Sequence, residues 1–463
     1  MPSGPDGFVA DPAYRREFER ARSLVLARPW RWRVIYHYDA DGIASASSAL
    51  RAFARLGYPA QATPLSAVER SRMAALLAAT PGPALVVDTG SSWPELYAAH
   101  AHPVVILDHH LYPGAPNPPA LPAHVGFVNP LDWGVDGMGE LCAATLTWLF
   151  TIFLDPRNWD NAPWGLSGAI GDRQHVGGFR GLNARLVEDA VARSLLVRRP
   201  GVPLFGASMG AAIAGSIDPF LPGLSGRPEA VGRFLEGLGV DAARPPASLT
   251  PEEGARLRAA LADRVRSAGR PPEALEVIEQ DRWFVPSLGV DAEEVSNLQS
   301  AAGRARMPGV GVAYALGDPA AADRTRAAEG GWRTGILNGL LRLESEGVNS
   351  MVHLQWFASP DTTLAGTQAG MAILYLLDPT RPVVVVSEGD GPTKVSARAT
   401  RALVARGVDL ASTLAAAART VGGEGGGHRI ASGATVPAGS RDRFLAEVDR
   451  LIGESLRAPA GAG

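Results

Sequence analysis

Three apolar runs near the start of the chain each stop at an acidic or histidine side chain, and helical stretches separate them. The runs are WRVIYHY (32–38), PALVVDTG (83–90) and PVVILDHH (103–110), with helix-like IASASSALRAFARLG (43–57) and PELYAAHA (94–101) between them. Strands that alternate with helices predict parallel βαβ units and a doubly wound α/β sheet. Because the carboxyl ends of such strands share one edge, where ligands collect, we expect the polar residues there to face one crevice.

The polar residues at these ends, with a further segment GAIGDRQ (168–174), form a candidate metal site: His37, Asp39, Asp41, Asp88, Asp108, His109, His110 and Asp172. The D-x-D spacing places Asp39 and Asp41 on the same side of an extended chain, because side chains alternate along it. Carboxylates and imidazoles without thiolates favour Mn²⁺ or Mg²⁺ over structural zinc. Two such ions about 3.5–4 Å apart hold a hydroxide and neutralise a phosphoryl group in line with it.

Composition excludes several other classes of protein. Cys142 is the single cysteine, which excludes an internal disulfide framework and a cysteine-based zinc site and predicts a cytoplasmic protein. The net charge of −3 predicts no general attraction to nucleic acid, so nucleic-acid binding would need a local basic patch. The most apolar helix-like stretch, ATLTWLFTIFL (144–154), is too short to cross a bilayer, and we expect no membrane partner.

The chain divides by pattern into four parts. We expect a metal-binding α/β domain, a mostly helical connector, a smaller α/β domain and a frayed tail, at residues 1–185, 186–334, 335–456 and 457–463. In the connector, Thr250 and Glu253 have the spacing of a helix capping box.

A second group of candidate residues lies in KVSARAT (394–400) and VGGEGGGHRIASGATVP (421–437). Closely spaced glycines let the backbone approach a ligand and offer N–H groups to phosphate oxygens, although they are also typical of a flexible loop. Arg398 offers a bidentate fork for phosphate, and Lys394 is the single lysine among 44 basic residues. In SAAGRAR (300–306), Arg304 is either a phosphate contact or an ordinary arginine at a helix end.

The order H-x-DADG, DTG, DHH and GD resembles the motifs of the DHH phosphoesterase superfamily, and the GGGH segment resembles its DHHA1 substrate-binding domain. The resemblance covers about residues 30 to 440 and implies a site with two Mn²⁺ ions, with Mg²⁺ as an alternative. Its implied metal ligands are Asp39, Asp41, bridging Asp88, His109 and Asp172, with His37 as a further candidate. It implies that His110 contacts the scissile phosphate and acts as an acid, while Asp108 orients an imidazole.

The same resemblance implies a second domain that grips the substrate across a cleft from the metals. The implied substrate-binding residues are Arg398, Gly426, Gly427 and His428, and we expect Gly425, Lys394 and Arg304 to contribute. Trp356, Phe357 and Tyr112 are candidates for stacking on bases.

The connector phrase DPFLPGLSG (218–226) and the phrase GVDLASTL (407–414) are most similar to those of archaeal RecJ-like exonucleases. This implies hydrolysis of single-stranded DNA or RNA to mononucleotides by hydroxide attack at two metals, in DNA repair or replication. We expect no additional oligonucleotide-binding domain. One alternative is a phosphoesterase for short oligonucleotides, cyclic dinucleotides or phosphoadenosine phosphate. Another is an accessory subunit of the replicative helicase assembly that contacts GINS.

Overall fold

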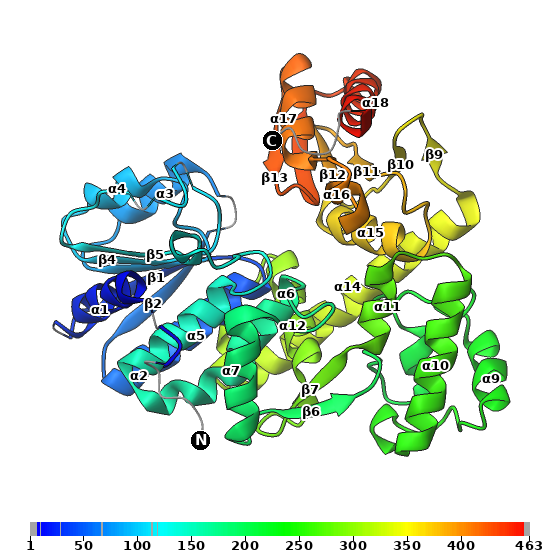
Figure 1. The fold of residues 1–463 in the computed structure, drawn as a ribbon, viewed down its shortest axis with the longest axis horizontal. Coiled ribbons are helices and arrows are strands. Elements are labelled where there is room, and N and C mark those ends of the chain that lie inside the picture. The colour runs from blue at the N-terminus through cyan, green and yellow to red at the C-terminus, as the bar shows by residue number, and fades with distance from the viewer. Residues whose placement is uncertain are drawn as a thin grey trace. The chain divides into compact units, whose positions relative to one another are not determined.

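The computed structural model describes residues 7–9, 11–27, 29–65, 68–112, 114–117 and 119–457, and the chain forms two compact units (Figure 1). Unit 1 comprises Met1–Pro200 and Asp281–Gly330, and unit 2 comprises Gly201–Gln280 and Gly331–Gly463. The segment predicted as a connector is therefore divided between the two units. In the segment predicted as a tail, Arg457 is the last residue of a helix, and residues 458–463 lie outside the described residues.

Unit 1 is built around a five-stranded parallel sheet. Its strands are β1 (Trp32–His37), β2 (Ala60–Leu65), β3 (Ala84–Val87), β4 (Val104–Leu107) and β5 (Val125–Val128), in the order β2-β1-β3-β4-β5. A smaller antiparallel sheet contains β6 (Val197–Pro200), β7 (Asp281–Val285) and β8 (Val290–Asp291). The helices of unit 1 are α1 (Pro12–Leu26), α2 (Ala40–Leu56), α3 (Arg70–Ala78), α4 (Pro94–Ala98), η2 (Pro130–Trp133), α5 (Ala143–Leu154), η3 (Pro156–Asn161), α6 (Ala162–Gly171), α7 (Gly181–Ala192), α12 (Ala292–Arg304) and α13 (Pro308–Ala315).

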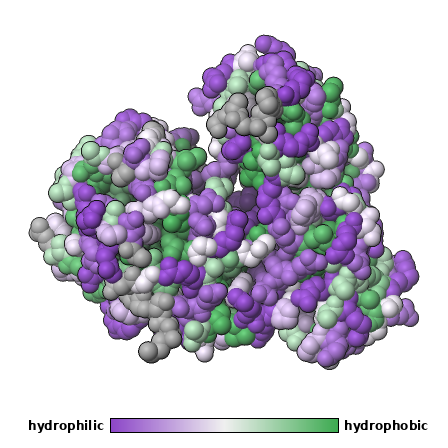
Figure 2. Space-filling model, viewed as in Figure 1, coloured by the Kyte–Doolittle hydropathy of each residue, from purple (hydrophilic) through white to green (hydrophobic). Residues whose placement is uncertain are grey.

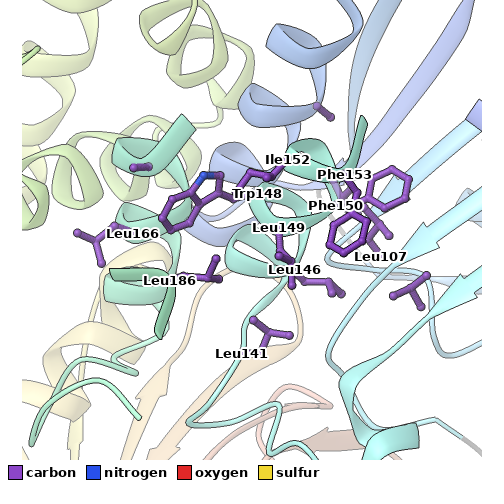
Figure 3. Packing of buried hydrophobic residues seen from close by; sticks show 14 of the residues in the cluster. Leu107, Leu141, Leu146, Trp148, Leu149, Phe150, Ile152, Phe153, Leu166 and Leu186 are labelled. Carbon is purple, nitrogen blue, oxygen red and sulfur yellow. The ribbon is translucent and has the colours of Figure 1, made fainter. Parts of the chain in front are cut away.

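The parallel sheet is covered on both faces, which confirms the doubly wound prediction. Alternate residues of each strand enter two different cores: Val34 and Val105 pack with α1, α2 and α5, whereas Ile35 and Ile106 pack with residues of α3 and α4. Helix α5 is apolar on all sides and buried along almost its whole length, and its large side chains fill the first of these cores (Figure 3).

Helix α14 (Pro319–Glu346) begins in unit 1 and ends in unit 2. The other helices of unit 2 are α8 (Met209–Ala214), α9 (Pro228–Gly237), η4 (Pro246–Ser248), α10 (Pro251–Ser267), α11 (Pro272–Glu279), α15 (Thr362–Tyr375), α16 (Arg401–Ala405), α17 (Leu410–Thr420) and α18 (Arg441–Arg457). The predicted capping box is confirmed, because Thr250 and Glu253 bond reciprocally at the start of α10.

Unit 2 contains a six-stranded mixed sheet. Its strands are β9 (Asn349–Ser350), β10 (Gln355–Ala358), β11 (Val383–Ser387), β12 (Thr393–Arg398), β13 (Glu424–Gly427) and β14 (Ala431–Val436), in the order β13-β14-β12-β11-β10-β9. Strand β13 is the glycine-rich segment, which therefore forms an edge strand paired with β14 rather than a loop. On one face, Val395 and Ala397 of β12 pack with α17 and α18, so Lys394, Ser396 and Arg398 lie on the opposite face.

Among the helices of the described residues, none is both long enough and apolar enough to cross a membrane. On the face drawn in Figure 2, hydrophobic residues lie scattered among hydrophilic ones in both units.

Candidate metal centre and substrate-binding segment

The strand register of unit 1 brings the predicted metal ligands to one level. Tyr36 pairs with Val87, and Val87 pairs with Leu107, so the next residues of the three strands emerge side by side. The direction of strand addition reverses between β1 and β3, because β2 lies on the far side of β1. Such a reversal opens a crevice at the carboxyl ends of the strands, where α/β proteins bind ligands.

The first cluster, which we call centre A, consists of His37, Asp39 and Asp88. His37 Nδ1 lies 2.9 Å from Asp39 Oδ2 and 3.5 Å from Asp88 Oδ2. The other Asp39 oxygen caps α2 by accepting a hydrogen bond from the N–H of Gly42 at 3.1 Å, which fixes the orientation of the carboxylate. Burial alone would lower the pKa of His37, but Asp39 and Asp88 raise it well above its ordinary value.

The second cluster, centre B, consists of Asp41, His109 and Asp172. His109 Nε2 lies 3.6 Å from Asp41 Oδ2 and 3.5 Å from Asp172 Oδ2. It also lies 3.4 Å from Asp88 Oδ1. One oxygen of Asp88 therefore faces centre A and the other faces centre B, which is the arrangement that a bridging carboxylate requires.

Asp88 is held in an unusual conformation at this junction. Its φ angle is 59°, in the left-handed region that few residues other than glycine, asparagine and aspartate adopt. Its side chain is buried, and among the described residues no group donates a hydrogen bond to Oδ2. A buried carboxylate oxygen without a donor is costly unless a cation is close, so this atom fits a metal site.

The carboxylates of centre B also fit a divalent cation. Burial and the negative charge of Asp88 raise the pKa of Asp41 to about 7. Burial and the charge of Asp41 likewise raise the pKa of Asp172 well above its ordinary value. Crowded carboxylates of this kind repel one another, and a cation with oxygen and imidazole ligands, such as Mn²⁺ or Mg²⁺, would remove the repulsion.

Asp108 is placed to orient His110. Asp108 Oδ1 accepts a hydrogen bond from His110 Nδ1 at 2.8 Å, and Oδ2 accepts from the N–H groups of Gly90 and Ser91, each at 2.7 Å. Burial acts to raise the pKa of Asp108, but His110 and these donors hold it well below its usual range. His110 remains 35% exposed, so its ring can reach a ligand from solvent.

Two groups of site contacts carried little signal in the sequence. Asp41 accepts hydrogen bonds from the N–H groups of Ala143 and Ala144, at 3.0 and 2.8 Å, so the N-terminus of α5 fixes its carboxylate. Every residue type except proline can donate such bonds, and the connection becomes visible only in the folded chain. The carbonyl of Gly137 accepts a hydrogen bond from His109 Nδ1 at 2.7 Å. This main-chain group likewise gives no residue-specific signal in the sequence.

Glycines bring the elements of the site into close contact. A Cβ on Gly42 would lie 2.1 Å from the carbonyl oxygen of His37, and one on Gly168 would lie 2.7 Å from Asp41 Oδ1. Here the sequence did carry a signal, because both glycines belong to the metal motifs DADG and GAIGD.

Arg304 ends α12 directly beside the turn that carries Asp39. A Cβ on its neighbour Gly303 would lie 2.1 Å from the carbonyl oxygen of Tyr38, so α12 packs closely against this turn. The SAAGRAR segment therefore lies in the same unit as both centres and adjoins centre A. A contact of Arg304 with phosphate stays a prediction.

The three glycines of β13 have different surroundings. A Cβ on Gly425 would lie 2.8 Å from the carbonyl oxygen of Leu414 in α17, and one on Gly427 would lie 2.9 Å from the carbonyl oxygen of Ala431. A Cβ on Gly426 would have no atom of the described part of the chain within 4 Å. Gly425 and Gly427 thus allow close packing and the hairpin turn, and Gly426 alone of the three leaves room for a ligand.

The charged residues of β12 share the face on which Gly426 lies. Gly426 pairs with Gly433, and Gly433 pairs with Ser396, which projects on the same side as Lys394 and Arg398. Lys394 Nζ donates to Thr435 Oγ1 at 2.8 Å, and Arg398 Nη1 donates to the carbonyl oxygen of Ala397 at 2.8 Å.

His428 lies at the turn that joins β13 to β14, where its main chain bonds with that of Ala431. Two of the three aromatic candidates are too buried to stack on a base. Tyr112 and Phe357 are 6% and 8% exposed and belong to hydrophobic cores, so they are not placed to stack on a base. Trp356 is half-buried and lies under the guanidinium of Arg441.

Comparison with known proteins agrees with this arrangement. The family model of the DHHA1 domain matches residues 362–454. An uncharacterized protein of Methanocaldococcus jannaschii is 27% identical over 432 residues, which are 92% of this chain and 94% of the relative.

Several solved structures have a similar fold. The crystal structure of exonuclease RecJ bound to manganese aligns with a TM-score of 0.58 and 18% identity, over 96% of this chain and 95% of that chain. RecJ from Thermus thermophilus in complex with Mn²⁺ aligns with a TM-score of 0.60 and 19% identity, over 98% of this chain and 56% of that longer chain. CDC45 from Entamoeba histolytica aligns with a TM-score of 0.62 and 11% identity, over 98% of this chain and all of that chain.

At these identities, the structural likeness shows a shared fold and leaves substrate and partners open. The candidate metal-site residues lie in unit 1, and unit 2 contains the DHHA1 match. The DHHA1 model match shows a DHHA1 domain at residues 362–454 of unit 2, and the fold of the chain is similar to that of the RecJ structures.

Proposed function

We propose that this chain is a RecJ-like exonuclease that hydrolyses single-stranded DNA or RNA to mononucleotides with two Mn²⁺ ions. The observation that carries the proposal is the placement of Asp88, whose two oxygens face His37 in centre A and His109 in centre B. A shared carboxylate between two oxygen- and imidazole-rich clusters is typical of two-metal phosphoesterases. The likeness to manganese-bound RecJ supports the choice of ion.

In this proposal one ion would be held by His37, Asp39 and Asp88. The other would be held by Asp41, His109 and Asp172, together with Asp88. When bound, the two ions would polarise the phosphoryl group and make water a better nucleophile at neutral pH. The chain itself fixes the ligand geometry, through the α5 N-terminus at Asp41 and the α2 cap at Asp39. Preset ligands reduce the reorganisation that the reaction would otherwise require.

His110 has the role of phosphate contact and proton donor. Asp108 accepts from Nδ1, which sets the orientation of the ring. Burial would lower the pKa of His110, but Asp108 raises it above its ordinary value, which favours the protonated ring. A protonated ring can donate to a phosphate oxygen or to the leaving group.

In unit 2, Lys394 and Arg398 have the role of phosphate anchors, with Gly426 and His428 on the neighbouring hairpin. The open space at Gly426 lets a ligand approach the main chain of β13. Gly426 lies on the same face of the sheet as Lys394 and Arg398. A phosphate backbone needs such local positive charge, because the chain as a whole has a net charge of −3. Arg304 would add a contact beside centre A.

The test is an end-labelled single strand and a dinucleotide, each incubated with Mn²⁺ and the purified chain. The proposal predicts Mn²⁺-dependent release of mononucleotides from the strand and no release with Asp41→Asn purified in parallel. A strand that the wild-type chain leaves uncleaved in the presence of Mn²⁺ would overturn the proposal. A preference for the dinucleotide of more than about a hundredfold in kcat/KM, or about 2.7 kcal/mol, would instead assign the chain to short oligonucleotides.

A further inference from the structure

A loop formed by residues 134–140 lies against His109 in unit 1, and its carbonyl group at Gly137 orients the imidazole. We propose that Gln174 and Asn183 are positioning residues for His109, acting through this carbonyl, and that they set the Mn²⁺ affinity of centre B. The inference rests on the metal centre of the proposed function and is independent of the substrate.

The contacts form a continuous buried chain. His109 Nδ1 lies 2.7 Å from the carbonyl oxygen of Gly137, and Gln174 Nε2 donates to the same oxygen at 2.8 Å. Asn183 Nδ2 then donates to Gln174 Oε1 at 2.6 Å. Asn183 and Gln174 are 0% and 4% exposed, so water does not compete for these bonds.

The chemistry of the groups fixes the direction of every bond. A carbonyl oxygen can only accept, so His109 must carry a proton on Nδ1 and Gln174 must present its NH₂ group. The Gln174 oxygen is then left for Asn183, which must also present its NH₂ group. With Nδ1 protonated, the lone pair of neutral His109 is on Nε2, the atom that faces Asp41 and Asp172. A histidine ligand commonly depends on such an outer hydrogen bond for its tautomer and orientation.

The loop itself is built to hold the carbonyl in place. A Cβ on Gly137 would lie 2.4 Å from the carbonyl oxygen of His109, so the two backbones touch and other residues do not fit. The N–H of Asp136 donates to Glu140 Oε2 at 3.0 Å, and the N–H of Glu140 donates to the carbonyl of Asp136 at 2.8 Å. The N–H of Asn183 donates to the carbonyl of Glu140 at 2.8 Å, so Asn183 holds both the loop and Gln174.

Gln174 also follows Asp172 closely in the chain. The segment after α6 therefore supplies a ligand of centre B and the donor that supports another ligand, His109. Residues 172–174 would thus support two ligands of the same ion.

Two variants test the proposal by calorimetric titration of metal-free full-length protein with Mn²⁺. Gln174→Met keeps the volume but removes the donor to Gly137, and we expect the Kd of one ion to rise about 10–100-fold. In Asn183→Leu, Gln174 can still donate to the carbonyl of Gly137, but its amide is free to rotate. We therefore expect a smaller rise in the Kd for Mn²⁺. Because Asn183 affects His109 largely through Gln174, the double variant should bind Mn²⁺ about as weakly as Gln174→Met alone.

Asn158→Leu is the matched control. Asn158 is fully buried in the same unit, and its Nδ2 donates to the carbonyl of Thr151 at 2.8 Å. This variant should lose stability and keep the Mn²⁺ affinity of the wild type.

An unchanged Mn²⁺ affinity in Gln174→Met would overturn the proposal, whatever happens to stability. If that variant does not fold, Asn183→Leu decides alone: a raised Kd supports the inference and an unchanged Kd overturns it. A wild-type chain that binds no Mn²⁺ would instead refute the proposed function.

Discussion

Asp88→Asn tests whether one side chain links two ions. Asparagine has nearly the size of aspartate and adopts the left-handed region readily, so the φ angle of 59° is no obstacle to folding. In the metal-free chain, the lost repulsion between Asp88 and Asp41 and the lost attraction to His37 and His109 oppose each other. We therefore expect the metal-free unfolding temperature to change little.

The Mn²⁺-dependent stabilisation should change far more. An ion present at about a hundred times its Kd stabilises the folded state by about 2.7 kcal/mol, so two ions give about 5.4 kcal/mol. For a unit of this size, each kcal/mol raises the unfolding temperature by about 2–4 °C, which predicts a rise of about 10–20 °C in the wild type. Because both centres lose a ligand in Asp88→Asn, the rise should fall below half of that value, and turnover should be lost.

The assay is thermal unfolding followed by circular dichroism, with EDTA or with increasing Mn²⁺. Glu95→Gln is the control, because Glu95 is an exposed carboxylate on the same unit, paired with Arg70. It should behave as the wild type. An Asp88→Asn chain that shows the full wild-type rise with Mn²⁺ would refute the bridging role.

Three further predictions follow from the packing and charge of the site. Gly426→Val should weaken nucleic-acid binding in a filter assay without loss of stability. Gly425→Val should instead destabilise unit 2, because the new side chain meets α17. Equal losses of stability in the two variants would contradict this prediction. Gly303→Ala should cost about 1–3 kcal/mol in urea denaturation, since its Cβ would meet the carbonyl of Tyr38, and a cost near zero would refute the close packing. The folded pKa of Asp108 is depressed, so the stabilisation it gives is present above its unfolded pKa of about 3.9 and is lost as pH falls through the folded pKa. In EDTA, the difference in free energy of unfolding between wild type and Asp108→Asn should thus be largest at neutral pH and should decrease on acidification. A difference that does not change with pH would contradict this prediction.

The clustering of the candidate metal-site residues could be predicted from sequence because each apolar run ends at a polar residue. The runs at 32–38, 83–90 and 103–110 correspond to β1, β3 and β4, the three strands whose ends carry candidate ligands. Buried parallel strands are recognisable by continuous apolar residues, and their carboxyl ends share one edge by topology. Strand β2 was missed, since AQATPL is an exposed edge strand that lacks such a run.

The other features of the fold and of the candidate site depend on contacts that local sequence patterns do not encode. Strand β13 consists of Glu424 and three glycines, a composition that disfavours strands, and it forms because β14 offers a pairing edge. The division of the connector between two units depends on packing between segments far apart in the chain. The supports of Asp41 and His109 are main-chain groups of Ala143, Ala144 and Gly137, which carry no residue-specific signal.

The most direct measurement of the central claim is anomalous diffraction at the manganese edge from crystals grown with Mn²⁺. We predict two peaks within unit 1, one contacted by His37 and Asp39 and the other by Asp41 and His109, with an Asp88 oxygen on each. A single peak that does not touch Asp88, or no peak among these side chains, would contradict the account.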